Sequence, residues 1–93
     1  MTYSIAFPDF GPMDVAIPAG FDDTSWKNDA CPSFIGFGLK IWVDYADAAK
    51  REMENLTRFA VVKVDEEGCD IEYVLQSDDW NEVLACIKTH TEA

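Results

Sequence analysis

Residues 58–76, RFAVVKVDEEGCDIEYVLQ, contain the pattern that decides the fold. The first part, residues 58–64, is β-branched and aromatic, and residues 71–76 alternate between apolar and polar side chains. Alternation with a period of two is typical of a strand with one buried face. Between the two parts lies a polar connection with Gly68, which supplies the left-handed backbone conformation of a tight turn. The stretch predicts a β-hairpin.

A further strand is predicted before this hairpin, at residues 39–45 (LKIWVDY). Its apolar residues Leu39, Ile41 and Val43 alternate with residues that face the other side of a sheet. The intervening residues 47–54 are rich in Ala, Lys and Glu but have no strong apolar stripe. They are consistent with a short exposed helix.

A helix is predicted after the hairpin, at residues 79–89. Trp80, Val83, Leu84 and Ile87 fall at i, i+3, i+4 and i+7, so a helix would bury all four on the sheet. Ser77 or Asp78 is expected to cap its N-terminus, because their side chains can accept hydrogen bonds from the first turn. Acids in that turn also suit the helix dipole.

The first part of the chain is predicted to be irregular. Residues 1–38 contain all four prolines and four of the five glycines, which keeps regular structure short. Met13–Ile17 is predicted to be one brief strand, and residues 22–29 fit a helical turn or an ordered loop. We therefore expect residues 1–93 to form one α+β domain, with an antiparallel sheet of three or four strands and the C-terminal helix packed on one face.

The cysteines and the apolar runs bear on the compartment. No run reaches the roughly 18 to 20 apolar residues of a membrane span, and no signal peptide is recognisable. Cys31, Cys69 and Cys86 are spaced too widely for a zinc motif and are odd in number. We expect all three to be reduced, with Cys86 largely buried beside the helix stripe, and the protein to reside in the cytoplasm of a bacterial host.

Enzymatic chemistry has little support in the sequence. The one histidine, His90, lies near the end of the chain, and no basic cluster is available to activate Cys31. Residues 65–70 lack the order of a calcium loop, and no glycine-rich phosphate loop is present. We expect no catalytic residues, no metal and no cofactor.

Charge is the strongest functional signal. The chain has 18 acidic and 7 basic residues, a net charge of −11, so it would repel nucleic acid and favours a basic protein surface as partner. Residues 64–87 contain eight acids and no base, which predicts one negative field. The alternative is a solvated edge that protects the sheet from aggregation. The candidate partner-binding acids are Asp65, Glu66, Glu67, Asp70, Glu72, Asp78 and Asp79.

Trp42 and Asp44 complete the candidate site. Trp42 is expected on the face of its strand opposite the buried residues Ile41 and Val43, where it could be exposed to solvent. An exposed tryptophan beside a carboxylate can anchor a protein interface. The alternative is that another segment covers this face, which would make Trp42 part of the core.

Four blocks of sequence carry a resemblance: DDTSWKNDACPSF (22–34), LKIWVDYADAAKRE (39–52), RFAVV (58–62) and SDDWNEVLACI (77–87). In this order they resemble a group of small acidic proteins associated with phages and proteobacterial mobile elements, over most of the chain from Phe21 onward. The resemblance implies no catalytic residues. By type, the chain is also similar to anti-CRISPR proteins, several of which are small acidic α+β domains that occupy the DNA-binding surface of a CRISPR effector.

The function expected from these observations is that of an acidic protein inhibitor. Its carboxylates would replace DNA phosphates on a basic channel of a CRISPR effector complex. The alternatives are an immunity protein that neutralises a basic nuclease toxin, a housekeeping acidic interaction module, and a small acid–base enzyme. An acidic pair in a deep pocket would favour the enzyme.

Overall fold

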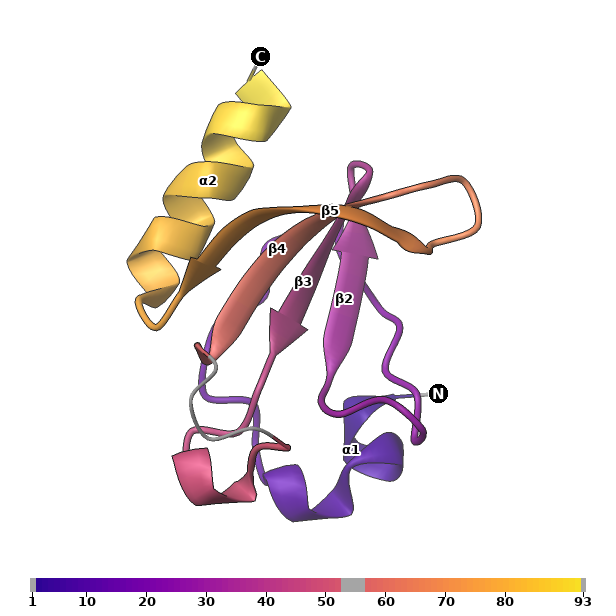
Figure 1. The fold of residues 1–93 in the computed structure, drawn as a ribbon, viewed down its shortest axis with the longest axis vertical. Coiled ribbons are helices and arrows are strands. Elements are labelled where there is room, and N and C mark those ends of the chain that lie inside the picture. The colour runs from indigo at the N-terminus through magenta and orange to yellow at the C-terminus, as the bar shows by residue number, and fades with distance from the viewer. Residues whose placement is uncertain (1, 53–56, 93) are drawn as a thin grey trace.

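The structure, a computed structural model, is an α+β fold with a five-stranded antiparallel sheet and a C-terminal helix (Figure 1), and it describes residues 2–52 and 57–92. The strand order follows the chain. The elements are α1 (Tyr3–Ala6), the 3-10 helix η1 (Pro8–Phe10), β1 (Asp22–Asp23), β2 (Ser33–Gly36), β3 (Leu39–Val43), the 3-10 helix η2 (Ala48–Lys50), β4 (Phe59–Val64), β5 (Asp70–Ser77) and α2 (Trp80–Glu92).

The predicted hairpin is confirmed as β4 and β5. Phe59 pairs with Ser77, and the turn closes through a hydrogen bond from the Asp65 N–H to the Cys69 carbonyl at 3.0 Å. Gly68 has φ +83°, as the turn requires. The register shifts twice along the pair, so β5 contains two bulges that bend it.

Two short strands were not predicted and enlarge the sheet beyond three or four strands. β2 joins β3 through a two-residue loop, Phe37 and Gly38, and the two-residue β1 pairs with β2. Residues 22–29 therefore begin as a strand and continue as a turn.

The predicted strand at Met13–Ile17 is wrong. In the structure Met13, Val15 and Ile17 are not paired with any strand and pack, half-buried, against the core. Apolar alternation there reflects a segment lying on the core, and the prolines that flank it limit ladder hydrogen bonds.

The helix expected within residues 47–54 is reduced to the single 3-10 turn η2. Asp47 caps this turn by accepting a hydrogen bond from the Ala49 N–H at 3.0 Å. Residues 53 and 54 lie outside the described residues.

The core lies on one face of the sheet, where the N-terminal segment and α2 cover it. Its buried side chains come from β2, β3, β4 and α2 and are Phe34, Leu39, Ile41, Val43, Phe59, Val61, Val83 and Ile87. Figure 1 shows α2 alongside β5, away from the N-terminal helices α1 and η1. The predicted alternation of β3 and the packing of α2 on the sheet are confirmed.

The helix stripe is only partly buried, which corrects the prediction for three residues. Val83 and Ile87 are in the core, but Trp80 is half-buried and Leu84 is 37% exposed. Cys86 is likewise only partly buried. The reason is position: α2 contacts the last two strands of the sheet, so part of its apolar stripe extends past the edge.

The start of α2 is capped one residue later than predicted. The Asp79 carboxylate accepts a hydrogen bond from the Asn81 N–H at 2.9 Å. Ser77 instead accepts from the Asp79 N–H at 2.9 Å and donates to Glu82 at 2.8 Å. Asp78 accepts from the backbone N–H of Arg58 at 2.8 Å, which joins the start of β4 to the end of β5.

Candidate functional site

The face of the sheet opposite the core contains a hollow. Trp42 alternates in β3 with the core residues Ile41 and Val43, so its side chain points to this opposite face. The hollow has a volume of about 220 Å³. Its lining comes from several elements and consists of Ala30, Cys31, Trp42, Asp44, Thr57, Arg58, Ala60, Asp70, Tyr73 and Gln76.

Three of the nine residues predicted from the sequence meet in this hollow: Trp42, Asp44 and Asp70. Trp42 is half-buried, between the exposed anchor and the core residue that the sequence left as alternatives. The most exposed aromatic residue of the hollow is Tyr73, at 63%. In a regular strand Tyr73 would lie on the same face of the sheet as Leu75. The bulge at Val74 instead turns the Tyr73 side chain to the face that contains Trp42.

Asp70 is bound on both of its carboxylate oxygens. Oδ1 forms an ion pair with Lys40 Nζ at 2.9 Å, and Oδ2 accepts a hydrogen bond from Trp42 Nε1 at 3.2 Å. Lys40 Nζ also lies 4.7 Å from the centroid of the Trp42 ring. These contacts join β3 to the start of β5, so Asp70 positions the Trp42 ring.

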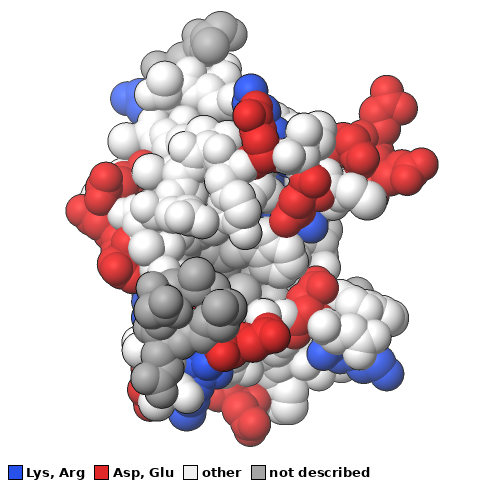
Figure 2. All heavy atoms as spheres, in the orientation of Figure 1, with Lys and Arg blue, Asp and Glu red and all other residues white. Residues whose placement is uncertain are grey.

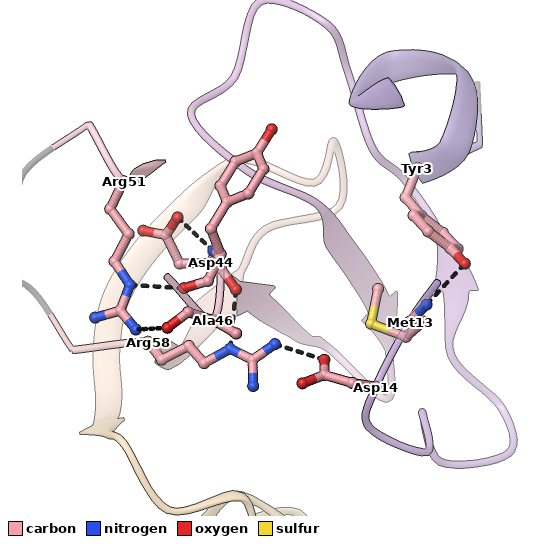
Figure 3. Close-up of polar contacts among 8 residues, drawn as sticks. Tyr3, Met13, Asp14, Asp44, Ala46, Arg51 and Arg58 are labelled. Atoms are coloured by element: carbon pink, nitrogen blue, oxygen red, sulfur yellow. Dashed lines mark hydrogen bonds and ion pairs between the residues drawn. The ribbon is translucent and has the colours of Figure 1, made fainter. Parts of the chain in front are cut away.

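Asp44 lies near Arg51 and Arg58, and Arg58 reaches Asp14 of the N-terminal segment (Figure 3). Its carboxylate accepts a hydrogen bond from the Tyr45 N–H at 2.8 Å, and burial raises the pKa of the Asp44 carboxyl. Arg58 donates from Nε to the Asp44 carbonyl at 3.0 Å and pairs through Nη2 with Asp14. The hydrogen bond from Arg58 lowers the pKa of Asp14. This network fixes the rim of the hollow.

The residues of the hollow that bear on enzymatic chemistry are Cys31, Asp44 and Asp70. Burial raises the pKa of the Cys31 thiol far above its usual range, and the Asp44 carboxylate raises it further, so the thiol stays protonated at neutral pH. The volume lies below the roughly 300–1,000 Å³ of typical small-molecule sites. Asp44 and Asp70 both line the hollow and are the acidic pair that an acid–base enzyme would need. Both carboxylate oxygens of Asp70, however, are already bound, one by Lys40 and the other by Trp42.

Five of the six remaining predicted acids flank β5, and Glu72 lies within the strand. Asp65, Glu66 and Glu67 are exposed in the β4–β5 turn, whereas Asp78 and Asp79 precede α2. A strand rises about 3.3 Å per residue, so the two groups are separated by roughly 25 Å. Figure 2 shows acidic groups over the turn and over the start of α2, with uncharged atoms and some further charged groups between them. The structure thus concentrates most of the predicted acids in two patches, with Glu72 on the strand between them.

Most of these acids also have structural partners. Asp65 accepts hydrogen bonds from the backbone N–H groups of Glu67 and Cys69, both at 2.9 Å. Glu72 forms an exposed ion pair with Lys63 at 3.2 Å. Within residues 2–52 and 57–92, the side chains of Glu66 and Glu67 have no hydrogen bond or ion pair.

No group of three or more His, Cys, Asp or Glu side chains in the described ranges is arranged to hold a metal ion. The helices of this part of the chain are too short or too polar to cross a membrane. All three cysteines are free; Cys31 is buried and Cys69 is exposed.

Comparisons of the chain with protein-family models, curated proteins and solved structures gave no match. The function is therefore inferred from the residues of this chain.

Proposed function

We propose that this protein is a stoichiometric inhibitor that binds a basic surface of another protein, with carboxylates in the place of DNA phosphates. The observation that supports this most is the pair Glu66 and Glu67 at the tip of the β4–β5 turn. Both are exposed, and neither side chain is used to hold the described fold together. Carboxylates that the fold does not need remain available to lysines and arginines of a partner.

The size of the charge is compatible with partial mimicry of DNA. Duplex DNA has one negative charge per about 1.7 Å of its axis. A duplex as long as the 36 Å axis of this molecule would therefore carry about 21 charges, roughly twice the net −11 of the chain. Electrostatic attraction would speed association, and apolar contacts would have to slow dissociation.

Tyr73 and Trp42 are the aromatic residues placed to supply such contacts. Tyr73 is largely exposed on the open face of the sheet, and Trp42 lies beside it in the hollow. Tyrosine and tryptophan concentrate binding energy at protein interfaces. Asp70 and Lys40 hold the Trp42 ring in place before binding, which reduces the entropy lost on association.

The first target class to test is the DNA-binding surface of a CRISPR effector complex, because such a surface is basic and the chain presents carboxylates that can replace DNA phosphates on it. In the experiment, purified effector complexes of several types are mixed with this protein, and DNA loading is measured with and without it. We expect one complex to lose DNA loading, with inhibition weakening as salt is raised. A basic nuclease domain is assayed in parallel, and inhibition of that nuclease alone would favour the immunity protein.

A charge-matched pair of variants tests the role of the turn. Glu66→Lys with Glu67→Lys should weaken inhibition mainly through slower association. Asp9→Lys with Glu52→Lys changes the net charge equally at two exposed acids, one in η1 and one just after η2, away from the β4–β5 turn, and should leave inhibition nearly unchanged. Equal inhibition by both variants and the wild type would remove the turn from the mechanism. Failure to bind any CRISPR complex would remove the anti-CRISPR proposal.

A further inference from the structure

One edge of the sheet is long and open. β5 pairs with β4 on one side and is the last strand of the sheet, so within the described residues its other edge has no strand partner. It is eight residues long, whereas β1 at the opposite edge has two. Natural proteins protect a long edge with lysine, proline, β-bulges or a covering helix; β5 contains two bulges but has neither lysine nor proline.

The side chains of β5 are unusually exposed for apolar residues. Ile71 and Tyr73 are each 63% exposed and Val74 is 41% exposed. Ile71 and Val74 are the residues left over at the two register shifts, so the bulges push them out of the ladder with β4. Because the two bulges bend β5, only a short part of its edge is flat. An edge of this kind can pair with a short segment.

Depressions on both faces of the sheet border this edge. On the open face, Tyr73 and Gln76 line the hollow that contains Trp42. On the core face, a shallow groove lies between β5 and α2. Val74 and Leu75 line it from β5, and Ala85 and Cys86 line it from α2. A strand added to β5 would direct alternate side chains toward these two depressions.

We propose that β5 binds an extended segment of a partner protein as a sixth, edge strand, and that this segment alternates apolar side chains with lysine or arginine. The charge around the strand supports a basic occupant: Glu72 lies on β5, Asp78 and Asp79 follow it, and Glu66 and Glu67 precede it. A second copy of this chain would bring an equal net charge of −11 to the same edge, which electrostatic repulsion disfavours. The inference rests on the proposed function, because it takes the partner to be basic.

The test uses a fluorescent synthetic peptide of about the length of β5 that alternates valine and lysine. Binding to the whole protein is measured by anisotropy, and amide hydrogen exchange locates the contact. We expect slower exchange in Asp70–Ser77. The control peptide is methylated at every backbone nitrogen, which keeps the charge and the side chains but removes the strand-forming N–H groups. It should bind at least about tenfold more weakly.

Two protein variants complete the test. Val74→Lys places a cation at the edge and should weaken binding, whereas Ile5→Lys makes the same change at an exposed residue of α1 and should not. If Val74→Lys fails to fold by circular dichroism, Ile71→Lys replaces it.

Several results would overturn the strand-addition proposal. These are equal binding of the methylated peptide, protection confined to the turn, and no binding of the unmethylated peptide. Dimerisation in sedimentation velocity, with β5 protected, would assign the edge to a second copy instead. Each of these outcomes leaves the charge-based inhibitor to be judged by its own DNA-loading assay.

Discussion

Trp80 stabilises the fold through its ring contacts but also buries an unpaired hydrogen-bond donor. Its ring packs on Phe59 with centroids 5.0 Å apart, but its buried Nε1–H has no hydrogen-bond partner among the described residues. Trp80→Ala should cost about 3–5 kcal/mol. Trp80→Phe keeps much of the ring contact and removes the unpaired donor, so we expect a loss of only about 1–2 kcal/mol. Urea unfolding of the two variants checks this, and equal losses would contradict it.

Asp44 should make stability depend on pH. Because burial raises its pKa in the folded state above the usual 3.8, the native protein binds the proton more tightly than the unfolded chain. Stability from this group is therefore lost as the pH rises from about 4 through the native pKa. Asp44→Asn retains an acceptor for the Tyr45 N–H but does not titrate. At neutral pH we expect the variant to be as stable as the wild type or more stable, and its relative stability to fall toward low pH.

The control for this prediction is Asp14→Asn, which should behave in the opposite way. Arg58 lowers the pKa of Asp14, so its contribution is present above the unfolded pKa and is lost as the pH falls through the folded pKa. Because Asp14 is about half exposed, its loss should cost at most about 1 kcal/mol at neutral pH. Urea unfolding at about pH 2.5, pH 4 and pH 7 distinguishes the two signs, because the Asp14 contribution is lost only below its lowered pKa, and parallel profiles would refute the assignment.

At the scale of elements, the β2–β3 turn contains a residue that the turn does not favour. Phe37 has φ +54° and Gly38 has φ +74°, the two positive values of a type I′ hairpin turn. Asparagine adopts this conformation far more readily than a bulky residue. Phe37→Asn and Phe37→Ala both remove the ring that contacts Phe21, but only alanine retains the full backbone strain. Chemical unfolding should find the Asn variant more stable than the Ala variant by about 1 kcal/mol. Equal stabilities would count against strain at this position.

Elements with a regular period could be predicted from the sequence, and those set by pairing could not. β3 alternates without interruption, and α2 has a complete apolar stripe, so both were found. β2 is too short and too evenly buried to show a period, and β1 depends on β2 for its partner. The exposure of Leu84 follows from the position of α2 at the sheet edge, which helical spacing does not reveal.

At the scale of the whole molecule, the same limit applies to the candidate site. Trp42 and Asp44 could be predicted because β3 alternates regularly. Asp70 could be predicted because it belongs to residues 64–87, which contain eight acids and no base. Tyr73 was missed because the bulge at Val74 reverses its face, and Arg58 because it reaches the site through contacts with distant segments. The sequence also predicted one negative field, whereas the length of β5 separates the acids of the turn from Asp78 and Asp79, with Asp70 and Glu72 on the strand between them.

Net charge should affect stability and binding in opposite directions. A net charge of −11 on a molecule of this size repels itself, and salt screens exposed charges over about 8 Å at physiological ionic strength. The free protein should therefore become more stable between low and physiological salt by roughly 0.5–1 kcal/mol, which is several degrees in Tm for a chain of this length. Partner binding should weaken over the same range.

The Glu66→Lys, Glu67→Lys variant separates these two effects. Removing two acids that the described fold does not use should raise its Tm at low salt and reduce the dependence of Tm on salt, while weakening partner binding. The Asp9→Lys, Glu52→Lys control should gain similar stability but retain binding. Asp65 is unsuitable for this test, because its carboxylate holds the turn through Glu67 and Cys69. A Glu66/Glu67 variant that loses both stability and binding would indicate a damaged turn and would contradict a purely electrostatic role for these two carboxylates.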